Sequence, residues 1–200
     1  MDWFSKFQLV FLILFYLTFL GRTIILSLKG VKVFVLGNGK KGFAAFLEVF
    51  FFIGLVVWSY ELVRLLYNIR IGIVPDILLR PLFELVPLKY LGVALTCGGY
   101  LIFILALKAF GESWRIGIDK DQPGSLVTNG IFRRLRNPIF LFVDLYFWST
   151  WLIISNWFFL LAAIVVTLGI HYQILEEERF LEQYYGESYR EYKSRSKRYI

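Results

Sequence analysis

The chain alternates between long apolar runs and short polar segments. Three runs are long enough for a full membrane crossing: Phe7–Leu28, Phe43–Leu66 and Leu88–Phe110. A helix needs about 20 apolar residues, at about 1.5 Å each, to cross roughly 30 Å of hydrocarbon. Two further runs, Pro138–Ser155 and Trp157–Gln173, follow each other so closely that they predict a helical hairpin. The pattern therefore predicts an all-α integral membrane protein with about five transmembrane helices and a C-terminal helical hairpin.

Composition supports this prediction, because the chain is too apolar for an ordinary soluble domain. Hydrophobic residues occupy 58% of the 200 positions and charged residues only 18%, whereas soluble chains are roughly 45–50% apolar even with glycine counted. A soluble domain of this size would still expose roughly 30% of its unfolded surface to water. One cysteine, Cys97, and one histidine, His171, exclude a disulfide scaffold and a Cys/His metal site. We therefore expect no metal.

Basic residues gather in three polar segments of the sequence. They are Lys29, Lys32, Lys40 and Lys41 in the first loop, Arg115, Lys120, Arg133, Arg134 and Arg136 in the central segment, and Arg190, Lys193, Arg195, Lys197 and Arg198 in the tail. With five crossings these segments fall on one face, which the positive-inside rule makes cytoplasmic. We expect the N-terminus outside and the C-terminus in the cytoplasm. The net charge of +7 indicates anionic membrane lipids rather than nucleic acid, because basic residues flank the apolar runs.

Ionisable residues within the first three helices have structural explanations. Glu61 and Arg64 are three residues apart and can pair along one helix. Arg22 and Glu48 either pair with each other or extend towards the headgroups. These roles leave residues 1–107 as an N-terminal three-helix region.

The remaining residues, 108–200, contain the chemistry-bearing positions and form the predicted cofactor-binding and catalytic region. Arg136-Asn-Pro138 precedes the first hairpin helix, where Asn137 suits the N-cap and Pro138 the first turn. Taken alone, this pattern also fits a capped helix start beside a lipid phosphate.

Three adjacent carboxylates, Glu176-Glu-Glu178, follow the second hairpin helix. They oppose the helix dipole and repel one another, so a cation should compensate them. The hairpin returns them to the face that carries Arg136-Asn-Pro138, and donors beside acceptors suit a zwitterionic ligand. The alternative is that Arg133, Arg134 and Arg179 simply neutralise the glutamates.

Four segments of this region occur in a recognisable order. They are Leu126-Val-Thr-Asn-Gly-Ile-Phe132, Arg136-Asn-Pro-Ile-Phe140, Glu177-Glu178 and Tyr185-Gly-Glu-Ser-Tyr-Arg-Glu-Tyr192. Over about residues 108–198 they resemble the isoprenylcysteine carboxyl methyltransferase family and, more distantly, the phospholipid methyltransferases. The resemblance implies an integral membrane enzyme that transfers a methyl group from S-adenosylmethionine. It also implies a cofactor pocket open to the cytosol and a lipidic or small hydrophobic substrate that enters from the bilayer.

By position, the resemblance implies which residues line the cofactor pocket. They are Gly124, Ser125, Leu126, Val127, Phe132, Asn137, Pro138, Ile139, Phe140 and Glu177. Apolar and aromatic members suit the adenine ring, and amide and carboxylate groups suit the amino-acid end. Glu177 is expected near the cofactor's positive charge.

Departures from the family pattern bear on the methyl acceptor. Gln173 stands where the carboxyl methyltransferases carry an arginine that faces a substrate carboxylate. Glutamine can form hydrogen bonds but cannot neutralise an anion, so a neutral or amine-bearing lipid, or a thiol, is favoured over a prenylcysteine carboxylate. Asn137 replaces a family histidine, and Phe132 and Phe140 replace tyrosines.

The candidate catalytic residues are Arg136, Asp144, Gln173 and Glu178. Methyl transfer mainly requires alignment of the reactants and exclusion of water. An ammonium acceptor must also lose a proton, for which Asp144, His171 and Glu178 are candidate bases. Asp144 lies about 9 Å into its helix, where an ionisable residue is a functional candidate by default. The alternatives are a structural partner for Asp144 and a packing role for His171.

Two other function classes remain open at this point. Membrane sterol reductases share a similar C-terminal arrangement but use NADPH, and they carry more helices ahead of this region. A non-catalytic lipid-binding scaffold is favoured by the missing histidine, tyrosines and arginine.

Overall fold

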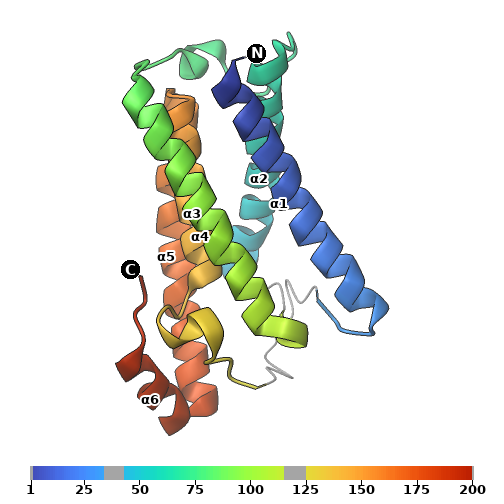
Figure 1. Ribbon diagram of the computed structural model, residues 1–200, viewed down its shortest axis with the longest axis vertical. Coiled ribbons are helices and arrows are strands. Elements are labelled where there is room, and N and C mark those ends of the chain that lie inside the picture. The colour runs from blue at the N-terminus through green and yellow to red at the C-terminus, as the bar shows by residue number, and fades with distance from the viewer. Residues whose placement is uncertain (1, 34–42, 115–124, 200) are drawn as a thin grey trace.

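The computed structural model describes residues 2–33, 43–114 and 125–199, and it is a bundle of helices running along one long axis (Figure 1). In chain order the elements are α1 (Trp3–Leu28), α2 (Phe43–Tyr67), η1 (Asp76–Leu79), α3 (Val86–Phe110), η2 (Gly111–Ser113), η3 (Gly130–Arg133), α4 (Pro138–Ile153), α5 (Trp157–Tyr185) and α6 (Glu187–Arg195). All five helices predicted from the apolar runs are present, and the all-α integral membrane fold is confirmed.

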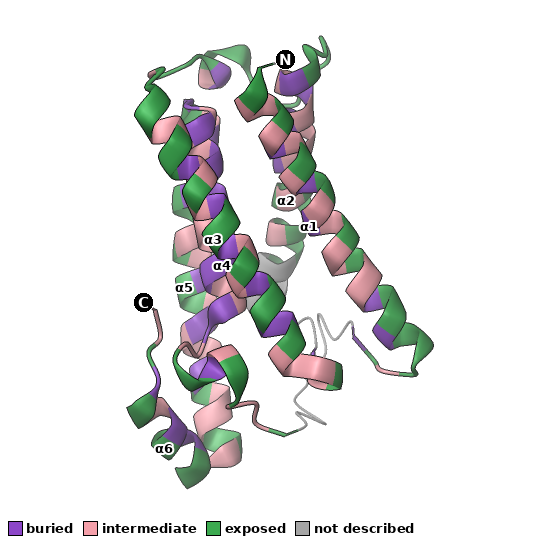
Figure 2. Ribbon diagram, in the orientation of Figure 1, coloured by how far each residue is buried: buried purple, intermediate pink, exposed green. Residues whose placement is uncertain are grey.

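Four of the helical segments within the described ranges are long and apolar enough to cross a membrane: Trp3–Leu28, Val49–Tyr67, Val86–Ser113 and Trp157–Tyr185. The fifth predicted crossing, α4, has only 16 residues, or about 24 Å of helix. It is the most enclosed of the five, since eight of its 16 residues are buried, whereas α1 buries five of 26. Figure 2 shows the long exposed and half-buried stretches of α1 and α3, which a bilayer would cover.

The hairpin of α4 and α5 turns at residues 154–156, as its sequence predicts. Asn156 Oδ1 accepts a hydrogen bond from the backbone N–H of Phe159 at 2.9 Å and caps α5. At its other end α5 continues past Gln173, where the apolar run stops, to Tyr185. It ends at Gly186, whose φ of 55° suits glycine. The extension carries the glutamates beyond the apolar part of the helix.

Small residues let α3 approach α4 closely. Gly92, Thr96 and Gly99 recur at the spacing of one helix face. The Thr96 hydroxyl donates to Ser149 Oγ at 2.7 Å. A Cβ atom at Gly92 would lie 2.8 Å from the Ser149 carbonyl oxygen and 2.7 Å from Ile153 Cγ1. This is the small-residue packing by which membrane helices associate.

Gly92→Ala is therefore expected to destabilise the bundle. The new methyl group would push the backbones of α3 and α4 apart where they touch, which lowers the free energy of unfolding by about 1–3 kcal/mol. The measurement is the thermal unfolding midpoint in detergent. Gly98→Ala is the matched control, because a Cβ there meets nothing within 4 Å. Equal midpoints for the two variants would contradict the close packing.

The end of the bundle that holds the N-terminus carries a buried ion pair. Glu61 Oε2 accepts from Arg64 Nη1 at 3.0 Å, so the predicted pair is confirmed. Glu61 Oε1 also accepts from the backbone N–H groups of Ile73 and Val74, at 2.7 and 2.9 Å. Arg22, at the other end, donates to the Gly111 carbonyl, and the side chain of its suggested partner lies outside the described residues.

The described parts of the three basic segments lie at the end of the bundle opposite the N-terminus, because successive long helices alternate in direction (Figure 1). Their described members are Lys29, Lys32, Arg133, Arg134, Arg136, Arg190, Lys193, Arg195, Lys197 and Arg198. The remaining four, Lys40, Lys41, Arg115 and Lys120, lie outside the described residues.

Candidate active site

The chain turns a corner before α4, at residues 134–137, and this corner is held by the tail of the chain, the residues that follow α6. The backbone N–H of Arg136 donates to the Lys197 carbonyl at 2.8 Å, and the Lys197 N–H donates to the Arg134 carbonyl at 2.8 Å. Leu135 and Lys197 thus form a short parallel bridge. The tail reaches this position because α6 turns back from the end of α5 at Gly186 (Figure 1).

The Arg136 side chain links the corner to α5 and to the tail. Its Nε donates to Glu178 Oε1 at 3.2 Å. Its Nη1 donates to the carbonyl of Lys193 at 3.1 Å and to that of Ser196. Only 9% of the guanidinium-bearing side chain and 4% of the Glu178 side chain are exposed. The arginine corner and the glutamate stretch therefore meet in a buried contact.

Glu178 has a second arginine partner from the tail. Arg198 Nε donates to Oε1 at 3.0 Å, and Nη2 donates to Oε2 at 2.6 Å. Fork-shaped pairing of this kind fixes both partners in orientation. The neighbouring glutamate behaves differently, since Glu176 pairs with Arg179 at 2.5 Å near the surface. Neutralisation of the glutamates thus uses Arg179, as the alternative explanation proposed, but Glu178 relies on Arg136 and Arg198.

A second, smaller core lies beneath this corner. Phe132, Tyr189 and Tyr192 are buried together with Ala106, and partly buried Leu126, Val127 and Ile139 pack against them. The Tyr192 hydroxyl donates to the Phe132 carbonyl at 2.9 Å. Burial raises the pKa of Tyr192 to about 12, so the phenol keeps the proton that this bond needs. Four predicted cofactor residues thus gather around the two tyrosines.

Asn137 is buried at the centre of the site with an unused donor. Its side chain is 8% exposed, and Nδ2 has no hydrogen-bond partner among the described residues. The predicted N-cap bond is not made, although Pro138 occupies the first turn of α4 as expected. The amide does not reach the helix terminus because the backbone at Asn137, with φ −125° and ψ 52°, lies outside the extended region that an N-cap residue ordinarily adopts.

The remaining predicted positions lie around this centre. Pro138 is buried, Ile139, Phe140, Gln173 and Glu177 are half-buried, and Ser125 is exposed. Ile139 and Phe140 pack against the main core. Gly124 lies outside the described residues.

Asp144 and His171 belong to the two hairpin helices, α4 and α5, within their apolar parts. Asp144 Oδ1 accepts from Thr167 Oγ1 at 3.0 Å, so α4 and α5 are joined by a polar contact. His171 Nδ1 lies 2.7 Å from the Tyr199 hydroxyl, and the two rings stack with centroids 6.1 Å apart. Both residues therefore have a partner within the protein. This agrees with the two structural alternatives, a partner for Asp144 and a packing role for His171, as well as with a functional role.

Several tail residues were not found from the sequence. Arg198 and Ser196 stand in a polar, basic stretch with no local pattern that separates them from their neighbours. Tyr189 and Tyr192 belong to the motif that suggested the resemblance, but nothing in it assigns them to a buried core. The one sequence signal for this arrangement is Gly186, because a glycine after a long helix favours a turn, and a turn there lets α6 fold back.

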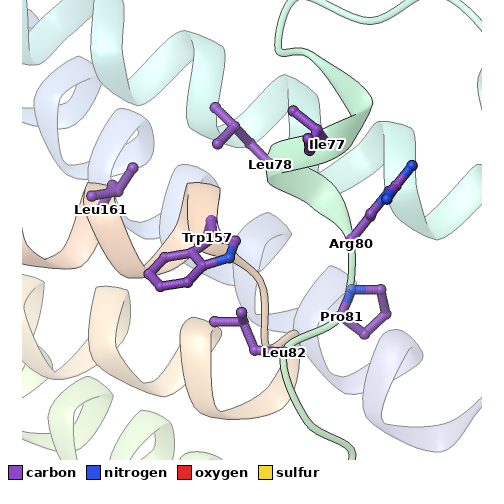
Figure 3. A pocket seen from close by; sticks show the side chains of 7 residues that line it. All are labelled: Ile77, Leu78, Arg80, Pro81, Leu82, Trp157 and Leu161. Atoms are coloured by element: carbon purple, nitrogen blue, oxygen red, sulfur yellow. The ribbon is translucent and has the colours of Figure 1, made fainter.

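A shallow pocket of about 410 Å³ lies at the opposite end of the bundle, and it is apolar except for Arg80 (Figure 3). Ile77, Leu82, Trp157 and Leu161 are among its walls. It shares no residue with the predicted site, so it is a separate feature.

Comparison with known proteins bears on the same region. A family model described as phospholipid methyltransferase matches residues 88–188, which run from α3 through the hairpin into α6. No curated protein is similar enough to the chain to count as a match.

Proposed function

The chain belongs to the phospholipid methyltransferase family, and we propose that it transfers a methyl group from S-adenosylmethionine to a lipidic or small hydrophobic acceptor. A membrane methyltransferase follows from the family and the apolar helices together. The choice of donor and of acceptor is the proposal.

The observation that carries the proposal is the buried contact between the Arg136 corner and Glu178. It joins the residues just before α4 to the C-terminal part of α5. Since about 20 helical residues cross the hydrocarbon, α5 reaches the membrane surface close to Glu177. A site at this level is open to a water-soluble cofactor on one side and to a membrane acceptor on the other.

The residues present fit S-adenosylmethionine. The unused amide donor of Asn137 is buried, and a buried donor without a partner is costly unless a ligand satisfies it. Glu177 supplies a carboxylate for the amino group, and Leu126, Val127 and Ile139 supply an apolar wall for the adenine. When bound, the cofactor provides an electrophilic methyl group on a positively charged sulfur.

The other residues of the site hold its parts in position and exclude water. Arg136, Glu178 and Arg198 hold the corner, the end of α5 and the tail in one arrangement. The aromatic core of Phe132, Tyr189 and Tyr192 keeps water from the base of the site. Excluding water and fixing the approach of the nucleophile are the main demands of this reaction.

Gln173 and Asp144 are proposed to face the acceptor. A neutral glutamine disfavours a carboxylate acceptor, and this supports an acceptor with a neutral or amine-bearing headgroup, or a thiol. Asp144, held by Thr167, is a partner for a cationic headgroup. Residues 108–200 would then form the catalytic region, beside the supporting helices of residues 1–107.

We also propose that the basic end of the bundle faces the cytoplasm. The described lysines and arginines of three segments lie at that end (Figure 1), which supports this orientation by the positive-inside rule. The cofactor side of the site would then open to the cytosol, where S-adenosylmethionine is made, and the N-terminus would lie outside.

The donor is tested by thermal unfolding of the purified protein in detergent. S-adenosylhomocysteine at 100 times its dissociation constant is expected to stabilise the protein by about 2.7 kcal/mol and to raise the midpoint. NADPH is expected to leave it unchanged. A shift with NADPH alone would favour a reductase. Incubation with radiolabelled methyl donor and fractionated native lipids then identifies the acceptor, and cofactor binding without any labelled lipid would favour a non-catalytic scaffold.

A further inference from the structure

After α6 the tail runs along α5, from the level of Glu178 towards that of His171. Arg198 lies on Glu178, and the next residue, Tyr199, lies on His171. Glu178 and His171 are seven residues apart and therefore share one face of α5, about 10 Å apart along its axis. Figure 1 shows this last stretch of chain rising beside α5. The tail thus contacts two polar groups at successive depths.

The deeper contact lies at the level expected for a membrane acceptor. His171 is two turns further into the membrane than Glu178, and it is exposed on the surface of α5. Asp144, on α4, lies at a similar depth, about 9 Å beyond the start of its helix. Polar and ionisable groups at such depth mark substrate paths. The acceptor side of the proposed site therefore contains His171, Asp144 and Tyr199.

The groups that face His171 come from three elements. Tyr199 contacts it from the tail, and the Asp144 carboxylate lies close enough to raise the pKa of Tyr199, in addition to the larger effect of burial. Glu178 and Arg198 stand on the cofactor side. A protonated phenol can accept a hydrogen bond from an imidazole N–H or donate one to an unprotonated ring nitrogen, so the tautomer of His171 decides which of the two occurs here.

We propose that Tyr199 positions His171 as the base that removes a proton from the methyl acceptor. This inference rests on the proposed function and deepens it, because it requires an acceptor that arrives with an ammonium or thiol proton. In this arrangement Nδ1–H is the donor and Tyr199 the acceptor, which is one of the two directions that the 2.7 Å contact allows, and Nε2 of the same ring is then unprotonated and free to act. The partner of one ring nitrogen selects the state of the other.

The proton step balances within the site. The N–H or S–H bond of the acceptor breaks, its electron pair stays on nitrogen or sulfur, and the proton binds Nε2 of His171. The imidazolium then returns this proton to water at the membrane surface. His171 touches the acceptor and is a catalytic residue, whereas Tyr199 acts through it and is a positioning residue.

The tautomer provides a test that does not depend on turnover. The chain contains a single histidine, so ¹⁵N-histidine labelling gives one unambiguous imidazole in an NMR spectrum. The wild-type protein in detergent at alkaline pH is expected to show the Nδ1–H tautomer. Tyr199→Phe, which keeps the ring, is expected to shift the population towards Nε2–H. A wild-type spectrum already dominated by Nε2–H would overturn the proposal.

Kinetics provide the second test, once an acceptor is known. His171→Gln is expected to lower kcat about a hundredfold and to remove the rise of kcat with pH on the acid side. Tyr199→Phe is expected to lower kcat about tenfold, with acceptor KM and S-adenosylhomocysteine affinity unchanged. Tyr184→Phe, an exposed tyrosine on α5, is the matched control and should match the wild type.

The two hypotheses fail in different ways. A wild-type protein that binds neither S-adenosylhomocysteine nor any methyl acceptor overturns the proposed function. A wild-type protein that turns over, while His171→Gln keeps the wild-type kcat and pH profile, overturns only the role of this pair.

Discussion

Arg136→Ala is expected to abolish methyl transfer and to destabilise the C-terminal region. The substitution leaves Glu178, whose side chain is 4% exposed, with Arg198 as its only remaining described arginine. It also leaves the carbonyls of Lys193 and Ser196 without the guanidinium donor. Removing one member of a buried ion pair costs about 3–5 kcal/mol. The measurements are the unfolding midpoint in detergent and the rate of methyl transfer to native lipids.

Arg134→Ala is the matched control for this prediction. Arg134 is exposed, and its described contacts with the tail use its backbone carbonyl, which the substitution keeps. Its midpoint and its rate should stay near those of the wild type. If both arginine variants lose stability equally, the loss reflects the basic surface in general, and the buried contact is not its cause.

Glu177→Ala is expected to weaken binding of the cofactor strongly. In the proposed site this carboxylate pairs with the cofactor's amino group, and hydrogen bonds to charged groups contribute about 1.5–3 kcal/mol. That range corresponds to a loss of affinity of about 10- to 150-fold. The measurement is calorimetric titration of S-adenosylhomocysteine into the purified protein in detergent.

The neighbouring glutamate provides the control. Glu176 pairs with Arg179 near the surface, with 41% of its side chain exposed, so Glu176→Ala should bind the cofactor with nearly wild-type affinity. An unaltered affinity in Glu177→Ala would instead show that the pocket was assigned to the wrong face of α5.

Helix positions could be predicted because hydrophobicity is a local property. Each apolar run is long enough to need a bilayer, and a helix is how a backbone satisfies its hydrogen bonds there. For this reason four of the five predicted starts agree within two residues, and α1 begins four residues before its predicted start. The end of α5 was missed by a wide margin, since its last turns lie beyond the hydrocarbon and carry charged residues.

The candidate site was only partly visible in the sequence. The hairpin predicts that the arginine corner and the glutamates meet, and Arg136 indeed contacts Glu178. Neither Arg198 nor Tyr199 could be assigned, because each contacts α5 through a return of the chain at Gly186 and a second short helix. The predicted N-cap role of Asn137 was wrong. An asparagine before a proline-initiated helix ordinarily caps it, whereas here the side chain makes no cap bond and its amide donor is buried without a partner among the described residues.

The amino-acid order alone determined that this chain is helical, that it belongs in a membrane, and that its chemistry-bearing residues follow the third apolar run. These are consequences of hydrophobic period, run length and residue type, which act over short stretches of chain. Only the tertiary structure decided which arginines pair with Glu178 and that the tail ascends α5 to reach His171. Those contacts join residues 20 to 42 positions apart, and a pairing over that distance is chosen by the geometry of the whole packed bundle.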